Sequence, residues 1–153
     1  MHTTNTHKKL TGECLCGAIA YEIDGKLGLV VNCHCSLCRK WHGTAFRTRA
    51  AVAKKQFKWV RGEALLSKYS APSSIKTFCS ICGSSLISLY ENNPDYIGLP
   101  LGGLDQDPGT RPVMNLFVGS KAPWYDITDG LPQHEEWPSG GAAAIRAAEE
   151  SSC

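Results

Sequence analysis

The sequence has no apolar run that approaches the roughly 20 residues needed to cross a bilayer as a helix. Its first ten residues, MHTTNTHKKL, lack the apolar stretch of a secretory signal peptide. It also shows no internal repeat, and no helical periodicity longer than two turns precedes residue 140. We therefore expect a protein of the reducing cytoplasm that has no membrane partner.

Cysteine, in contrast, is abundant, with eight residues in a chain of 153. In a reducing compartment, clustered CxC and CxxC spacings bind metal more often than they form disulfides. Seven cysteines form three groups: an N-terminal pair (Cys14, Cys16), a triad (Cys33, Cys35, Cys38) and a knuckle pair (Cys79, Cys82). The eighth, Cys153, lies in a C-terminal tail and is interpreted as a free thiol.

Short alternating segments separated by turn residues predict a mainly β protein. We expect one domain over residues 11–138, between a flexible arm (1–10) and a flexible or weakly helical tail (139–153). The predicted strands cover 11–23, 27–32, 44–52, 57–60, 64–69, 75–78, 84–90, 96–101 and 113–118. The first two strands, which carry or precede two cysteine groups, are expected to be neighbours in one sheet. Trp124 and Tyr125, in a Pro-containing segment after the last strand, are expected to pack into the core.

Seven thiols divide into four and three, and two partitions compete. In the preferred one, the N-terminal and knuckle pairs close a four-cysteine zinc site, and the triad forms an open second site. The rival joins Cys35 and Cys38 to the knuckle pair as a zinc ribbon. That ribbon would need a gap of about 40 residues between its CxxC units, against the usual 15 to 20. Gly83, which follows the knuckle pair, fits the positive φ that often closes such a turn.

Two histidines lie close to the triad. His34 stands between two triad cysteines and would point away from them in an extended chain, so we interpret it as a packed or surface residue. His42 is weighed as a fourth zinc ligand, which would make the triad a closed structural site. A partner's ligand could close it in the same way.

An open three-thiolate zinc carries a formal charge of −1, which suits a soft fourth ligand better than water. An incoming thiol would bind as a thiolate and become a nucleophile for a carbonyl carbon. The product would be a hemithioacetal, formed without a redox step or an organic cofactor.

Between Ser36 and Gly62 the chain has no acidic residue. It has eight basic ones, at positions 39, 40, 47, 49, 54, 55, 58 and 61. Arg39 and Lys40 directly follow the triad and are best placed to bind the carboxylates of a thiol substrate; the other basic residues are interpreted as a solvated face.

The same segment supports an alternative function. Its basic residues alternate with Trp41, Phe46, Phe57 and Trp59, a mixture that can bind nucleic acid. A non-catalytic zinc module that binds nucleic acid or protein through residues 39–61 is therefore the competing interpretation. We disfavour nucleic acid because a strand-rich segment needs these aromatics for its core, and because the chain has 16 basic and 14 acidic residues.

Four stretches in order, GECLCGAIAYEI, CHCSLCRKWHG, TFCSICGSSL and FVGSKAPWYDITDGLPQHEEWP, resemble the glutathione-dependent formaldehyde-activating enzyme and centromere protein V family. The resemblance spans about Gly12 to Pro138. It implies a β-tent fold of several small, twisted antiparallel sheets. It also implies two zinc ions per chain, a structural one on the N-terminal and knuckle pairs and a second on the triad.

The activity that the resemblance implies is of the carbon–sulfur lyase type. In that reaction the thiol of glutathione adds to formaldehyde and gives S-(hydroxymethyl)glutathione. The sequence departs from the family at Asn115, where relatives often carry His. It also has Trp41 and His42 at positions that are commonly small or variable.

Overall fold

The computed structural model describes residues 8–143 and 145. Most of the predicted arm and tail, with Cys153, lies outside these residues. The chain forms two compact units. Unit 1 takes in the chain up to Lys26, Val52–Ile97 and Gly103–Pro108; unit 2 takes in Leu27–Ala51, Gly98–Gly102 and the chain from Gly109 on. Neither unit is a continuous segment, and one domain over 11–138 stays a prediction.

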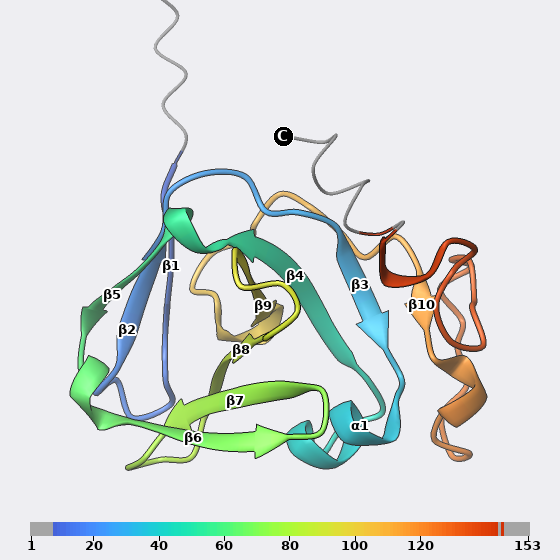
Figure 1. The fold of residues 1–153 in the computed structure, drawn as a ribbon, viewed down its shortest axis with the longest axis horizontal. Helices are drawn as coiled ribbons and strands as arrows, with labels where there is room; N and C mark the ends of the chain where they lie inside the picture. Colours follow the sequence, from blue (N-terminus) through green and yellow to red (C-terminus); the bar gives the residue numbers. More distant parts are fainter. Residues whose placement is uncertain (1–7, 144, 146–153) are drawn as a thin grey trace, which may run out of the picture. The chain divides into compact units, whose positions relative to one another are not determined.

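The mainly β prediction is confirmed (Figure 1). The strands are β1 (Leu10–Glu13), β2 (Ala20–Ile23), β3 (Val30–Cys33), β4 (Arg47–Ala53), β5 (Phe57–Arg61), β6 (Leu66–Ala71), β7 (Ser74–Cys79), β8 (Ser85–Leu89), β9 (Tyr96–Pro100) and β10 (Asn115–Leu116). The named helices are α1 (Ser36–His42) and four 3-10 turns: η1 (Lys54–Gln56), η2 (Glu63–Leu65), η3 (Leu101–Gly103) and η4 (Val118–Ser120). Residues 141–143 and 145 are also helical. None of the helices in the described part of the chain is long and apolar enough to span a membrane.

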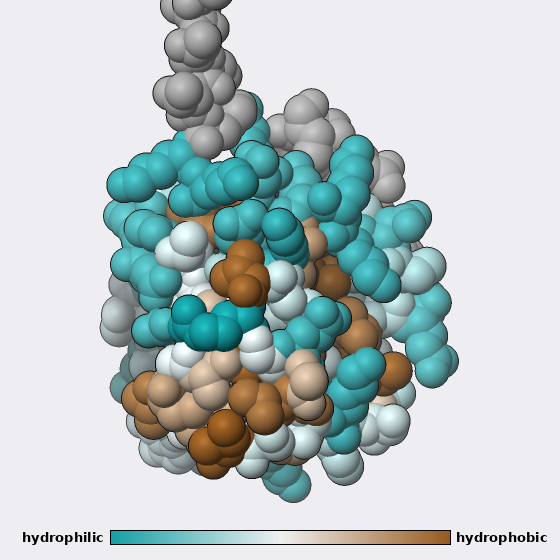
Figure 2. Space-filling view, turned by 90° about the vertical axis from the view of Figure 1, so that its left-hand side faces the viewer, coloured by the Kyte–Doolittle hydropathy of each residue, from teal (hydrophilic) through white to brown (hydrophobic). Residues whose placement is uncertain are grey.

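Unit 1 contains a three-stranded antiparallel sheet in the order β1-β2-β5, together with antiparallel β6-β7-β8. The two alternating aromatic residues of β5, Phe57 and Trp59, both pack against the buried ring of Tyr21. Their ring centroids lie 5.2 and 6.1 Å from that of Tyr21. Apolar side chains also reach the surface of the protein, where Figure 2 shows them in brown among hydrophilic neighbours.

The prediction of one strand over 11–23 is wrong, because the chain reverses between β1 and β2. Leu10 pairs with Ile23, and Leu15, which the alternation placed with the buried residues, is 89% exposed. The expected adjacency of the first two predicted strands is wrong as well. β2 pairs with β1 and β5, whereas β3 pairs with β4 and β10.

Unit 2 is built on β3, which pairs antiparallel with β4 and parallel with β10. The β3–β10 pair is parallel, whereas β1–β2, β2–β5, β3–β4, β6–β7 and β7–β8 are antiparallel. The buried side chains of Val31 on β3, Leu116 on β10 and Ile145 form a hydrophobic cluster. The expectation for Trp124 is wrong, since its side chain is 72% exposed. Tyr125 packs against Phe46, with 5.4 Å between ring centroids.

Candidate metal centres

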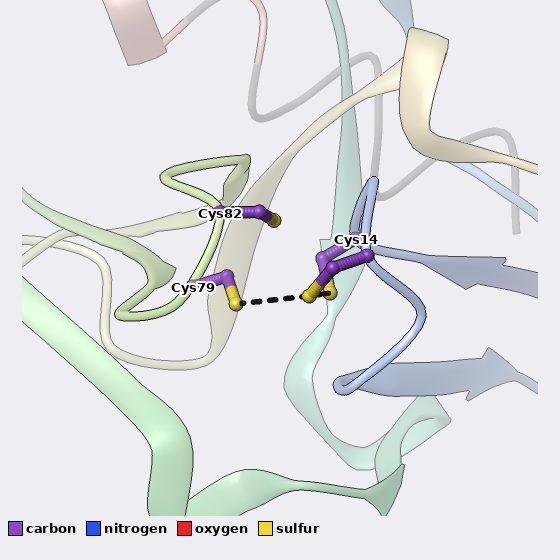
Figure 3. A group of neighbouring side chains, drawn as sticks. Cys14, Cys79 and Cys82 are labelled. Carbon is purple, nitrogen blue, oxygen red and sulfur yellow. Dashed lines mark hydrogen bonds between the residues drawn. The ribbon is translucent and has the colours of Figure 1, made fainter.

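Two turns of unit 1 bring the N-terminal and knuckle pairs together (Figure 3). The four Sγ atoms all lie within 4.8 Å of one another. The Sγ of Cys16 lies 3.6 Å from that of Cys14 and 3.9 Å from that of Cys79. A zinc ion with four sulfurs at 2.3 Å in a tetrahedron has sulfur–sulfur edges of about 3.8 Å. The donor set and its spacing therefore fit zinc.

A glycine at positive φ closes each of these turns. The N–H of Gly17 donates to the carbonyl of Cys14 at 2.9 Å, and the N–H of Gly83 donates to that of Cys79 at 2.8 Å. Their φ values are 76° and 77°, which confirms the prediction for Gly83. The reversal after β1 was missed because Leu15 and Ile19 continue the strand alternation through it. Gly17 was the residue in the sequence that could have indicated a turn at this point.

Hydrogen bonds tie the two turns together and stabilise thiolate. The N–H of Leu15 donates to Oγ of Ser84 at 2.9 Å, so the first turn is held against the second. The hydroxyl of Ser84 is 3.2 Å from Sγ of Cys82 and, with the Ser84 N–H, lowers the pKa of Cys82 to about 5. A thiolate is the form of cysteine that binds metal.

The triad lies at the junction of β3 and α1 in unit 2. Cys33 ends β3, Cys35 is the N-cap residue of α1, and Cys38 lies in the first helical turn. Their Sγ atoms lie within 4.8 Å of one another. The N–H of Cys38 donates to Sγ of Cys35 at 3.3 Å. The CxxC pair of the triad therefore lies at the start of a helix, where the N-cap residue Cys35 provides one sulfur and the first turn provides the other.

The three thiols share protons unequally. Hydrogen bonds from the thiol of Cys33, the thiol of Cys38 and backbone N–H groups lower the pKa of Cys35 to about 2. The same contact with Cys35 raises the pKa of Cys33. The triad thus favours a thiolate at Cys35.

The structure forms the preferred partition of the seven cysteines. The rival ribbon is not formed, since Cys35 and Cys38 group with Cys33 and not with the knuckle pair. Within the described residues, no fourth ligand atom from His, Cys, Asp or Glu joins the triad at this spacing, and His42 is outside the group. Both clusters can bind a metal ion, one with four sulfurs and one with three.

Arg47 is the residue near the triad that the sequence interpretation missed. It was placed on a solvated face, which is wrong, because only 4% of it is exposed. On β4 it pairs directly with Cys33. The hydrogen bond with Cys33 and the charge of Arg47 act to lower the pKa of Cys38, but the contact with Cys35 and burial outweigh them and raise it. The sequence shows an arginine in the predicted strand that follows the triad. It does not show that this arginine is buried, because its burial depends on how the strands pair.

Arg39 and Lys40 lie on α1 immediately after Cys38. Nε of Arg39 donates to the carbonyl of Ser120 at 3.1 Å, which orients a half-buried guanidinium. Lys40 is exposed. A role for these two cations in binding carboxylates remains a prediction.

His34 is a packed residue, as expected. It is fully buried, and its ring lies 4.9 Å from that of Phe46 between centroids. Nε2 of His34 is 2.9 Å from Oδ1 of Asn115. Asn115 therefore serves as the hydrogen-bond partner of the histidine that stands between Cys33 and Cys35.

Three of the aromatics that a nucleic-acid surface would require are half-buried and pack against other rings of the protein. Phe46 packs on His34 and Tyr125. Phe57 and Trp59 pack on each other, with 4.8 Å between centroids. These rings contribute to packing within their own units.

Comparison with known proteins agrees with the geometry. The model of the family described as glutathione-dependent formaldehyde-activating enzyme matches residues 9–120, which include both cysteine clusters. A crystal structure of a Rhodobacter sphaeroides protein, a structural genomics target, is similar with a TM-score of 0.52 and 26% identity. The similarity covers 67% of this chain and 91% of that one. This chain belongs to the glutathione-dependent formaldehyde-activating enzyme family.

Proposed function

We propose that the protein is a carbon–sulfur lyase that adds a thiol, glutathione in the family's reaction, to a small aldehyde such as formaldehyde. The product would be S-(hydroxymethyl)glutathione. The observation that carries the proposal is the contrast between the two clusters. Four sulfurs can complete the coordination of a tetrahedral metal ion, whereas the triad provides three sulfurs with no fourth His, Cys, Asp or Glu ligand among the described residues.

Each cluster would hold one zinc ion. The closed cluster of Cys14, Cys16, Cys79 and Cys82 has a structural role, because it joins turns that are more than 60 residues apart in the chain. Cys33, Cys35 and Cys38 would hold the second ion. Zinc on three thiolates supplies a fourth position that suits a sulfur ligand and favours its deprotonated form.

The residues around the triad would bind and orient the thiol substrate. Arg39 and Lys40 follow Cys38 on α1 and would bind the carboxylates of glutathione. Arg39 is already oriented by its hydrogen bond to the Ser120 carbonyl. Their position next to the triad would hold the sulfur of the substrate close to the reacting carbon.

The reaction needs no oxidant or reductant. The thiol loses its proton, its sulfur forms a bond to the carbonyl carbon, and the carbonyl oxygen takes up a proton. The seven clustered cysteines must remain reduced for this chemistry, which supports a location in the reducing cytoplasm.

Titration calorimetry with glutathione tests the proposal. We expect the protein to bind glutathione, and Cys35→Ser to abolish binding. Arg39→Gln and Lys40→Gln should each lower the affinity for glutathione by about threefold to tenfold. The affinity for 2-mercaptoethanol, which has no carboxylate, should not change. The rate of hydroxymethyl thioether formation must also exceed the rate without protein.

The competing function has its own measurement. A zinc module that binds nucleic acid would bind single-stranded DNA with an affinity that falls steeply as salt increases. Such binding, with no detectable glutathione binding, would overturn the proposed function. Phe46, Phe57 and Trp59 are half-buried and pack against other rings, which favours the enzyme.

A further inference from the structure

Arg47 occupies an unusual place for a charged residue. It is 4% exposed and stands on β4 directly opposite Cys33 of β3. In an antiparallel pair, directly opposed side chains leave the sheet on the same face, with their Cβ atoms about 4.5–5.5 Å apart. The guanidinium stem therefore rises from the sheet beside the first sulfur of the triad.

A buried guanidinium needs anions near it. Arginine stays protonated in proteins, so it cannot relieve the cost of burial by losing its charge. The triad has the complementary need, because three thiolates and one divalent cation sum to −1, and a thiolate as fourth ligand makes the sum −2. The β3–β4 pair thus brings a buried positive charge to the face of the sheet on which the triad gathers negative charge.

We propose that Arg47 is the buried counter-charge of the triad and biases its fourth position toward an anionic thiolate over a neutral ligand. The part that concerns the fourth ligand rests on the proposed function. Arg47 is a positioning residue and not a group that must touch the substrate.

The other cations near the triad are less suited to this role. Lys40 is exposed and Arg39 is half-buried, so water and salt screen their charges more strongly. Arg49 is two residues further along β4 and pairs with Val31 instead of a cysteine. Arg49 is therefore a matched control, with the same side chain on the same strand.

The test compares Arg47→Met, Arg47→Gln and Arg47→Lys with Arg49→Met in the zinc-loaded full chain. Calorimetry measures the binding of 2-mercaptoethanol, whose only charge is its thiolate, and of neutral imidazole. We expect Arg47→Met and Arg47→Gln to weaken the binding of 2-mercaptoethanol by about tenfold or more, because each removes a nearby buried charge. Imidazole should change by less than about threefold, and Arg47→Lys and Arg49→Met should stay within about threefold of the parent for both ligands.

A second readout does not depend on thiol binding. Competition with a chromophoric chelator measures the affinity of the more weakly held zinc. Arg47→Met and Arg47→Gln should lower this affinity by about tenfold or more, while Arg49→Met should not. If the parent protein binds no thiol, the proposed function fails, and the zinc affinities still decide the role of Arg47.

Several results would overturn the inference. One is an unchanged affinity for thiol and for zinc in folded Arg47→Met or Arg47→Gln. Another is an equal loss for thiol and imidazole, which would indicate a general distortion of the site. If circular dichroism shows that neither Arg47→Met nor Arg47→Gln is folded, the thiol and zinc affinities of Arg47→Lys test the inference. Retained thiol and zinc affinity supports the charge role, and a tenfold loss of either contradicts it.

Discussion

The buried ring of His34 and the buried amide of Asn115 are joined by a hydrogen bond, with 2.9 Å between Nε2 and Oδ1. Nδ2 of Asn115 donates to both carboxylate oxygens of Asp129 at 3.1 Å, so the amide oxygen must face the histidine. Nε2 of His34 therefore carries the hydrogen. This chain of contacts ties the residue between two triad cysteines to β10 and to the turn at Asp129.

Asn115→Leu should remove both contacts while filling a similar volume. The buried ring of His34 would lose its acceptor, and Asp129 would lose a donor. We expect the free energy of unfolding, measured with urea, to fall by about 2–4 kcal/mol.

Asn92→Leu is the control, because Asn92 is exposed in the turn that follows β8. It should change the free energy of unfolding by less than about 0.5 kcal/mol. Equal effects of the two substitutions would show that the contacts of Asn115 do not contribute to stability.

The two cysteine clusters should respond differently to loss of one sulfur. Cys35→Ser should leave one zinc ion per chain and a cooperative unfolding transition, because the triad lies within one strand and the helix that follows it. Cys79→Ser should lower stability by several kcal/mol, since the four-cysteine cluster joins distant turns. Zinc content by mass spectrometry and urea unfolding measure both.

Ser is a close steric match for Cys, so each cysteine variant serves as the control of the other. If both variants unfolded to the same extent, the division into a structural and an open site would be wrong. The same conclusion would follow if Cys35→Ser kept two zinc ions per chain.

The cysteine clusters were predictable because their spacing is local. CxC and CxxC keep two ligands close to each other whatever the fold, and Gly83 marked the knuckle turn in the sequence. Segments such as β5 and β9 were also predicted closely, since alternation and turn residues define them. The reversal at Gly17 was not predicted, because the alternation of Leu15 and Ile19 continues through it.

The role of Arg47 was beyond a sequence reading for a different reason. An arginine in a strand is usually solvated, and nothing in its neighbours indicates burial. Its environment is created by pairing with Cys33, 14 positions earlier in the chain. The burial of Asn115 likewise depends on its parallel pairing with Asn32, a long-range contact. Contacts of this kind become visible only when the register is known.

Gly83→Ala should test the conformation of the knuckle turn separately from its packing. Gly83 has a φ of 77°, and a Cβ placed there would meet no heavy atom within 4 Å. The cost is therefore one of backbone conformation, which we expect to lower the free energy of unfolding by about 1–2 kcal/mol. Zinc retention at the closed cluster should fall in parallel.

Gly102→Ala is the matched control for that substitution. A Cβ at Gly102 also meets no heavy atom within 4 Å, and its φ is not in the left-handed region. Its stability and zinc content should stay at the parent values within about 0.5 kcal/mol. If Gly102→Ala lowered the free energy of unfolding as much as Gly83→Ala does, the positive φ of Gly83 would not explain the effect.

Ile145 lies within the tail predicted to be flexible or weakly helical, and it is 3% exposed and packs with Val31 and Leu116. Val31 is on β3, two residues before Cys33. Ile145 therefore packs against the strand that carries the first cysteine of the triad. Ile145→Ala should lower the free energy of unfolding by about 2–4 kcal/mol through lost burial and a cavity. Val113→Ala, at a residue 40% exposed, should cost less than about 1 kcal/mol. If Ile145→Ala cost no more than Val113→Ala in urea unfolding, this residue would not belong to the core of unit 2.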